Sequence, residues 1–361
     1  MNLSNRHGWI GVDLGTRCVK LAQVVRTPSG LRLRHAAVIQ RPVPWSEADT
    51  LATAAPDASY VEIRAALECS RFRGHSAACL LPMNVCELRA LNIPHGTDEE
   101  RRAMIGNELA DDWDTFPASP EFDFWELQED RGSGAAEAFN VDVLAVTRPW
   151  VTQVARDCRA ASLDCWGVDG NPTAMARSIQ AVKPLHSGER VLAIDWGYSN
   201  ATLCVVGNGG PLYARRIHRC GLRDGLAAVV NTLGITLDHA QHLVDTQGVL
   251  VASESASGDR EVRAAITTAL ADAIQELMAE VQRTLRFFDL QRRHLRPSSI
   301  WLMGGGASVR NIGPHLSQML SLPVRVWDIP LDANESLETS GIRTQLLSGA
   351  VALSALAWRA T

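Results

Sequence analysis

Two short stretches of this sequence carry the residue types that hold a phosphate chain and a divalent cation. Residues 9–20 read WIGVDLGTRCVK, and residues 191–202 read VLAIDWGYSNAT. Each apolar run ends in Asp, followed by Gly after one residue, a hydroxyl-bearing residue and a second apolar run. Glycine lets backbone N–H groups approach phosphate oxygens, the hydroxyl donates a further hydrogen bond, and the carboxylate can hold Mg²⁺, usually through water. The pattern predicts two strand–turn–strand hairpins that face each other across a nucleotide.

Individual roles follow from these side-chain chemistries. Asp13 is predicted to face Mg²⁺, while Gly15 and Thr16 hold the terminal phosphates. Lys20 would add positive charge near them. The second copy offers the corresponding residues Asp195, Gly197, Tyr198, Ser199 and Thr202. Either stretch alone could be an ordinary turn, since Asp and Gly are common in turns, but two copies together favour the phosphate site.

A third element, LMGGGAS, places three glycines between an apolar strand and a predicted helix. Such a turn lets a flat base or a phosphate lie against the backbone. Its glycine spacing is neither that of the P-loop nor that of the dinucleotide-binding motif. If this protein binds phosphate, it therefore uses a different type of fold. A plain strand–helix turn is the alternative. The residues concerned are Gly304, Gly305, Gly306, Ala307 and Ser308.

Glu280 and Arg283 lie three residues apart in AEVQRTLRFF, within a long predicted helix. This spacing places both side chains on one helix face. They are predicted to contact the ribose and adenine of a nucleotide lying over the glycine turn. An ordinary surface ion pair is the alternative.

The composition excludes several classes of protein. A chain of 361 residues with a formal charge of −5 is long enough for two domains and is not typical of a dedicated nucleic-acid binder. The eight cysteines have no Cys-x-x-Cys spacing, which predicts buried reduced thiols rather than a structural zinc site or disulfides. The N-terminus lacks the apolar core of a signal peptide, and LLSGAVALSALAW is predicted to be a buried helix. These features predict a cytoplasmic protein.

Hydrophobic periodicity predicts an α/β chain with an inserted unit at residues 84–165. The unit contains a strand, a helix, two paired strands and a closing helix. Thr97 precedes Glu100 by three residues, the spacing of a capping box that opens the first of these helices. After the second hairpin, helices are predicted at 222–247 and about 260–290, and VRVWDIP is predicted to be the last strand.

The order of these motifs resembles the actin-like ATPase superfamily. Within it, the chain is similar to the PilM family, the actin-like proteins of type IV pilus assembly, which are relatives of the division protein FtsA. The resemblance covers nearly the whole chain. It is carried by IGVDLGTRCVKLAQV, LNIP and the helix after it, VDGNPTAMARSI, EVQRTLRFF and IWLMGGGASVRNIGPHLSQMLSLPVRV.

The resemblance implies an actin-like (ribonuclease H-like) two-domain ATPase fold with an FtsA-type α+β insert. The first actin-type domain would comprise residues 1–83 with 166–187 and 329–361, and the second residues 188–328. The two domains would clasp ATP and Mg²⁺, with Asp13 and Asp195 near the metal and the other nucleotide contacts on the three motifs above.

The resemblance also implies a role. The protein would be a scaffold of the pilus alignment complex that binds the cytoplasmic tail of a PilN-like inner-membrane protein beside the insert. It could also contact the pilus motor ATPases, and would touch the membrane only through partners. Asn171 stands where relatives often have an acidic residue, and an amide cannot act as a general base, so ATP turnover is expected to be slow at most. Trp196 replaces a medium aliphatic residue and is expected to point away from Asp195 into the core.

Two alternatives belong to neighbouring classes. A sugar or small-molecule kinase of the same superfamily would use Asp169 as its base, although the Cys-x-Cys-Gly zinc pattern of one large kinase group is absent. A GspL-like cytoplasmic component of type II secretion is the other alternative. That family continues into a transmembrane helix, and the neighbouring gene would discriminate between the two systems.

Overall fold

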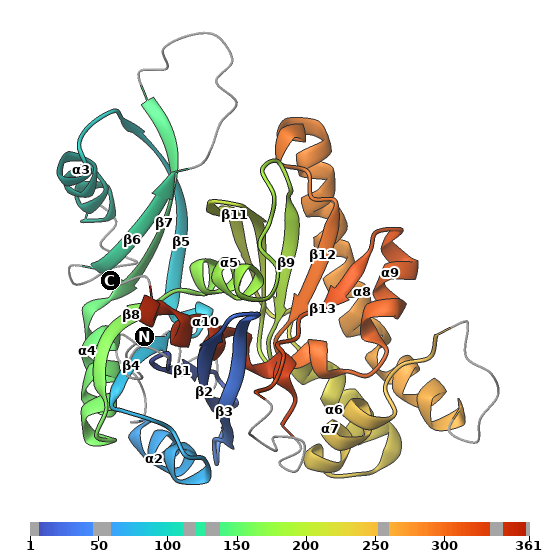
Figure 1. Ribbon diagram of the computed structural model, residues 1–361. Coiled ribbons are helices and arrows are strands. Elements are labelled where there is room, and N and C mark those ends of the chain that lie inside the picture. Colours follow the sequence, from blue (N-terminus) through green and yellow to red (C-terminus); the bar gives the residue numbers. More distant parts are fainter. Residues whose placement is uncertain are drawn as a thin grey trace.

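The computed structural model describes residues 7–45, 59–110, 120–126, 138–251, 260–332 and 342–358. Within these residues the chain forms two five-stranded sheets and one three-stranded sheet (Figure 1). The two larger sheets lie on either side of the molecule's centre, and the smaller sheet extends from the first of them.

The two five-stranded sheets share one plan. In each, three consecutive strands pair antiparallel, and two later strands add in parallel beside the first. The first sheet has the order β3-β2-β1-β4-β8, with β1 (Ile10–Leu14), β2 (Cys18–Thr27), β3 (Gly30–Gln40), β4 (Ser76–Leu80) and β8 (Asp164–Asp169). The second has the order β11-β10-β9-β12-β13, with β9 (Val191–Trp196), β10 (Ala201–Gly207), β11 (Gly210–Ile217), β12 (Ser299–Met303) and β13 (Val324–Val326). The repeat predicted from two hairpins therefore extends to whole sheets.

Helices cover both faces of each large sheet, which explains why β1 and β10 are buried along their whole length. Two helices lie between the sheets (Figure 1), namely α5 (Asn171–Val182) and α10 (Ser348–Ser354). The outer face of the first sheet packs against α2 (Tyr60–Cys69) and α4 (Arg148–Ala160). The outer face of the second packs against α6 (Leu222–Leu233), α7 (Leu237–Thr246), α8 (Arg260–Gln291) and α9 (Ile312–Leu320).

The C-terminal apolar stretch forms α10, which is buried as predicted. It packs on β1 and α5. None of the helices in the described part of the chain is long and apolar enough to cross a bilayer.

The structure adds detail to one predicted region and shortens another. The helical material predicted at 222–247 forms two helices, α6 and α7, because Gly234 adopts a left-handed conformation (φ 64°) that ends α6. Thr236 then caps α7 by accepting a hydrogen bond from the His239 N–H. The last predicted strand is also shorter, since β13 ends at Val326 and the buried Trp327 follows it.

The inserted unit is a three-stranded antiparallel sheet with one helix on it. Its order is β5-β7-β6, with β5 (Cys86–Pro94), β6 (Pro120–Glu126), β7 (Ala138–Thr147) and α3 (Asp98–Ala110). The capping box is confirmed: the Thr97 N–H donates to the Glu100 carboxylate (2.8 Å) and the Glu100 N–H to the Thr97 hydroxyl (3.3 Å). Although α4 lies within the predicted unit 84–165, it packs on the first sheet through Trp150 and Val154.

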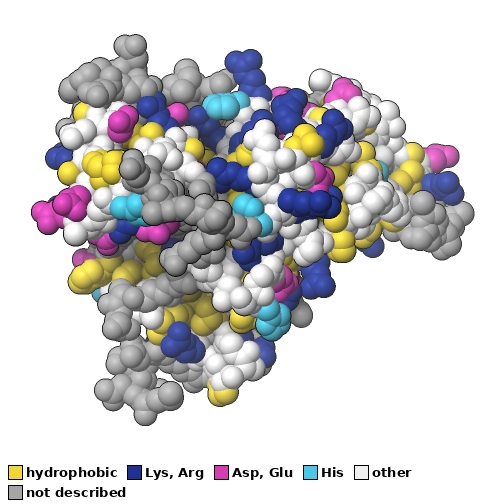
Figure 2. All heavy atoms as spheres, turned by 90° about the horizontal axis from the view of Figure 1, so that it is seen from above, with side chains coloured by type: hydrophobic (Ala, Val, Ile, Leu, Met, Phe, Trp, Pro, Cys, Tyr) yellow, Lys and Arg dark blue, Asp and Glu magenta, His cyan; other side chains and the backbone are white. Residues whose placement is uncertain are grey.

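Figure 2 shows one face of the molecule, seen from above the insert and the far end of the second sheet. Charged side chains of both signs lie on it, and Lys and Arg gather over its middle. A cavity of about 330 Å³ lies between the insert and β11, and Arg215, Arg216 and Arg292 line it. Asp142 of β7 lines the same cavity and is buried.

Candidate functional site

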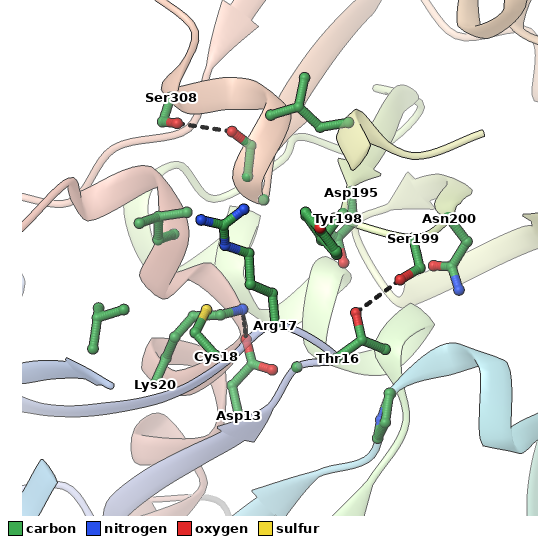
Figure 3. A pocket seen from close by; sticks show the side chains of 18 of the residues that line it. Asp13, Thr16, Arg17, Cys18, Lys20, Asp195, Tyr198, Ser199, Asn200 and Ser308 are labelled. Atoms are coloured by element: carbon green, nitrogen blue, oxygen red, sulfur yellow. Dashed lines mark hydrogen bonds and ion pairs between the residues drawn. The ribbon is translucent and has the colours of Figure 1, made fainter. Parts of the chain in front are cut away.

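The turns of the two predicted hairpins meet at the centre of the molecule. The Thr16 and Ser199 hydroxyl oxygens lie 3.0 Å apart, within hydrogen-bond distance, although they belong to different sheets (Figure 3). A cavity of about 290 Å³, which we call the hairpin cavity, opens beside this contact. In each mixed sheet the Asp lies at the carboxyl end of the strand that pairs in parallel with a later strand, so the shared pairing plan brings the two Asp side chains to corresponding places.

In the first hairpin the carboxylate is neutralised by its own strand partner. Asp13 and Lys20 are opposite each other in the antiparallel pair β1–β2, and the Lys20 Nζ lies 2.6 Å from Asp13 Oδ2. Both side chains are mostly buried. Burial is the largest single influence and by itself would lower the pKa of Lys20, but the charge and hydrogen bond of Asp13, together with Cys18 and Asp195, raise that pKa overall.

In the second hairpin the carboxylate is held by an amide. Asn171, the first residue of α5, donates from Nδ2 to Asp195 Oδ2 at 2.7 Å and to the Thr202 hydroxyl at 3.3 Å. Burial raises the pKa of Asp195, while Lys20 and the Asn171 hydrogen bond act in the opposite direction. Asn171 contributes no charge, so the negative charge of Asp195 has no directly bonded cation in the described part of the chain.

The glycine turn closes tightly over the second hairpin. Gly304 has φ +82°, and a Cβ there would lie 2.1 Å from Asp195 Oδ1. A Cβ at Gly306 would lie 2.1 Å from the ring of Trp196. Trp196 is fully buried in the core of the second sheet, as predicted, and supports the turn from below. Only glycine fits at these two positions, because a side chain would enter either the carboxylate or the indole.

Most of the predicted site residues line the hairpin cavity. They are Asp13, Gly15, Thr16, Lys20, Asp195, Gly197, Tyr198, Ser199, Gly304, Gly305 and Ser308. Thr202, Gly306 and Ala307 are buried behind this lining. Thr202 takes part through its hydrogen bond with Asn171, and Gly306 through its contact with Trp196.

Glu280 and Arg283 do not lie at the hairpin cavity. They occupy the middle of α8, where Glu280 forms an ion pair with Arg215 of β11 (2.7 Å) and another with Arg283. Their shared helix face is as predicted, but it packs beside the outer strand of the second sheet. The structure therefore does not bring them together with the glycine turn, and the surface ion pair describes their geometry.

Several lining residues were not predicted. The Arg17 guanidinium stacks over the Tyr198 ring at 5.1 Å, and its Nη1 is buried without a hydrogen-bond acceptor. Figure 3 shows Arg17 directed into the cavity. On the opposite wall Ser308 donates to the Asp245 carboxylate (2.8 Å), and Arg343 donates to the Asp245 carbonyl (2.6 Å). The position of Arg17 beside Thr16 was a signal in the sequence, whereas Asp245 and Arg343 carry no motif.

The lining fits a phosphate chain with a hard cation. Asp13 and Asp195 provide carboxylate oxygens and Thr16 and Ser199 provide hydroxyls, which are donors that Mg²⁺ accepts directly or through water. The unpartnered N–H of Arg17 offers a donor to an anion. The oxygen donors suit the cation, and the Arg17 N–H suits the phosphate chain.

Asp169, the base of the alternative kinase reading, lies outside the hairpin cavity. Its carboxylate forms an ion pair with Arg177 (2.7 Å) and accepts hydrogen bonds from the Thr173 hydroxyl (2.5 Å) and the Gly170 N–H (2.8 Å). With these partners it is fully engaged in holding the start of α5.

Comparison with known proteins identifies solved structures that share this fold. Neither a protein-family model nor a curated protein matches the sequence. Among solved structures, the PilM–PilN type IV pilus biogenesis complex matches 97% of this chain and 98% of the other, with a TM-score of 0.75 and 21% identity. The ethanolamine utilization protein EutJ of Carboxydothermus hydrogenoformans matches 96% and 89%, with a TM-score of 0.55 and 13% identity. MreB5 of Spiroplasma citri bound to ADP matches 97% and 96%, with a TM-score of 0.50 and 12% identity. The chain therefore has the actin-like ATPase fold, which it shares over nearly its whole length with PilM.

Proposed function

We propose that this protein is a cytoplasmic, ATP-binding scaffold of a type IV pilus inner-membrane assembly complex, which holds the cytoplasmic tail of a PilN-like partner. The full-length similarity to the PilM–PilN complex is the observation that carries the proposal. In this proposal the actin-type domains are residues 1–83 with 166–187 and 329–361, and residues 188–328, with 84–165 as the insert.

The nucleotide would bind in the hairpin cavity. MreB5 bound to ADP, and a MamK mutant bound to AMPPNP with a TM-score of 0.50 and 11% identity, share the fold. Asp13 and Asp195 would hold Mg²⁺, while Thr16 and Ser199 would exchange their mutual contact for phosphate oxygens. Arg17 would add a donor that the motifs alone did not reveal.

Turnover would be slow, because the polar group nearest Asp195 is the Asn171 amide. An amide has no proton-accepting form at neutral pH and cannot activate a water molecule. The nucleotide would then act by favouring one relative arrangement of the two sheets rather than by being consumed.

Equilibrium binding of Mg-ATP tests the site. Asp13→Ala and Asp195→Ala are each expected to weaken binding by about tenfold or more, the effect of losing one charge-assisted contact of about 1.4 kcal/mol. Asp164→Ala, which removes an exposed carboxylate outside the hairpin cavity, is the matched control. Unchanged affinity in both site variants would contradict the nucleotide assignment.

The partner tail would bind in a second cavity between the insert and the first sheet. This cavity, which we call the insert groove, has a volume of about 440 Å³ and is lined from β6, β7, α4 and β8. Within the described residues, β6 and β8 each have a strand neighbour on one side only, so both present open edges to it. Half-buried Phe124 and Trp166, which is 67% exposed, add apolar surface.

An extended tail suits such a groove. Open strand edges supply backbone hydrogen bonds, and the apolar pockets between them select alternate side chains of an added strand. A large exposed tryptophan beside them is typical of a residue that becomes buried on binding.

Binding of a synthetic PilN-like tail peptide, followed by fluorescence anisotropy, tests the insert groove. Trp166→Ala and Phe124→Ala are expected to weaken binding by about tenfold each. Val43→Ala, at an exposed apolar residue outside the groove, is the control. Equal affinity for all variants, with Mg-ATP binding intact, would contradict the groove while leaving the nucleotide site standing.

A further inference from the structure

Three cysteine thiols that lie far apart in the sequence converge beneath the insert groove. Cys79 of β4, Cys158 of α4 and Cys165 of β8 have all their Sγ atoms within 4.8 Å of one another. The Sγ atoms of Cys79 and Cys158 are 3.1 Å apart. Spacing along the chain predicted scattered thiols, and only the fold brings these three together.

The sheet register explains the convergence. Cys165 pairs with Ala77, and Cys79 lies two residues beyond Ala77, so the two thiols project from the same face of neighbouring strands. A bulge follows directly, because Gly167 pairs with Ala78 and Trp166 is the extra residue. Helix α4 covers that face and brings Cys158 down onto both strands.

The cluster is buried yet has a route to solvent. Cys79 and Cys158 are fully buried, whereas Cys165 is partly exposed and lines the insert groove. Cys165 also lies within hydrogen-bond distance of the Gly167 carbonyl, to which its thiol donates at 3.5 Å. A ligand arriving through the groove would therefore meet Cys165 first.

We propose that Cys79, Cys158 and Cys165 form a binding site for a soft, thiophilic d¹⁰ cation of the Cu⁺ and Zn²⁺ class. Three sulfur donors with no oxygen or nitrogen ligand in the described cluster select soft ions over Mg²⁺ or Ca²⁺. This site shares no residue with the hairpin cavity, and of its three thiols only Cys165 also lines the insert groove.

The geometry requires little rearrangement. A cation about 2.3 Å from each sulfur would hold the sulfurs roughly 4 Å apart. The three Sγ atoms are already within 4.8 Å of one another, so the main change needed is an opening of the Cys79–Cys158 pair from 3.1 Å. Each coordinating thiol releases its proton to solvent, and the cation keeps its oxidation state, so no oxidant or reductant is needed.

Cu⁺ is the favoured member of the class. It accepts three sulfur ligands, whereas structural Zn²⁺ is almost always four-coordinate and would need a water molecule from the side of the insert groove. Two titrations separate the ions: Cu⁺ against bathocuproine disulfonate under nitrogen, and Zn²⁺ against a chromophoric chelator, both with the full reduced chain.

The expected result is one equivalent of Cu⁺ bound per chain, with an affinity that falls by at least about tenfold in Cys165→Ser. Zn²⁺ is expected to bind more weakly at the same site. Cys69→Ser, which removes an exposed thiol, and Cys220→Ser, which removes a buried thiol elsewhere, are controls that keep full affinity. Absence of stoichiometric binding of either ion would overturn the proposal, as would loss of binding in Cys69→Ser.

A measurement on the unaltered chain covers the case in which Cys165→Ser does not fold. Bound Cu⁺ is expected to protect Cys165 from alkylation by iodoacetamide while leaving Cys69 reactive, as read by mass spectrometry. Equal alkylation of Cys165 with and without the ion would overturn the site.

Discussion

The two hairpins at the centre of this protein have the same backbone plan and different electrostatics. Asp13 is bonded to the Lys20 ammonium of its own hairpin, whereas Asp195 is bonded to the neutral Asn171 amide of a helix between the sheets. The first carboxylate is thus neutralised before any ligand arrives. The second carboxylate, Asp195, keeps a buried negative charge that a bound cation would neutralise. Repetition of a fold did not repeat the chemistry, because the charge partners come from positions outside the repeated Asp-x-Gly pattern.

Lys20→Met gives the sharpest contrast between the two hairpins. Removing the cation leaves Asp13 charged and mostly buried, and breaking such a pair costs about 4 kcal/mol. Urea unfolding of the ligand-free protein measures the loss. Lys183→Met, which breaks the more exposed pair with Glu189, should cost less than about 1 kcal/mol. The double variant Asp13→Asn, Lys20→Met should recover much of the stability, and its failure to do so would mean that Lys20 acts by packing alone.

Asp142 is a third buried carboxylate, and few neighbouring groups stabilise its negative charge. Burial raises its pKa to about 7, although the Ala214 N–H and Arg292 act in the opposite direction. Its Oδ2 has no hydrogen-bond partner. The folded pKa lies above the unfolded value near 4, so the folded protein binds the extra proton, and stability should fall as pH rises from about 4 to 7.

Asp142→Asn should remove this fall, because the amide can still accept from Ala214 and carries no charge. Between pH 4 and pH 8, the stability of the variant relative to the wild type is expected to rise by on the order of 4 kcal/mol, at about 1.4 kcal/mol for each of three pKa units. Urea midpoints at the two pH values measure the difference. Glu87, Arg216 and His218 line the same cavity in both proteins, so the comparison isolates the change at residue 142. A pH-independent difference would contradict the raised pKa.

Gly306→Ala tests whether the second hairpin depends on packing as the first depends on charge. The new Cβ would lie 2.1 Å from the Trp196 ring, and overpacking of this kind costs about 2 kcal/mol. Gly305→Ala is a matched control one residue away, where the nearest atom would be 3.9 Å distant. Adding Trp196→Leu should relieve part of the cost in the double variant, as read from thermal unfolding. Equal losses at both glycines would argue against the indole contact.

Thr16→Val and Ser199→Ala address the one hydrogen bond that joins the hairpins directly. In the ligand-free protein their coupling energy should be about 1 kcal/mol, the usual value for a neutral hydrogen bond. With saturating Mg-ATP the coupling should vanish, because both hydroxyls would turn to phosphate oxygens. Double-mutant cycles from thermal unfolding with and without nucleotide measure both values. Coupling that persists at full strength with nucleotide would mean that the hairpins stay joined.

Local patterns predicted the parts of the site that one segment builds by itself. The Asp, Gly and hydroxyl residues of each hairpin, and the start of α3 at Thr97, depend on neighbours within a few positions. Long-range packing decided the rest. Glu280 and Arg283 share a helix face as their spacing requires, yet spacing does not reveal which neighbour that face meets, and here it is Arg215.

By itself, the sequence determined the two hairpins, the glycine turn and the succession of most elements along the chain, because turn chemistry and hydrophobic period act over a few residues. Tertiary structure alone decided which groups complete each site. It placed Asn171 on Asp195, Arg17 over Tyr198 and three distant cysteines around one point. The physical reason is that charge and coordination act over a few ångströms in space, and positions that are close in space can be far apart along the chain.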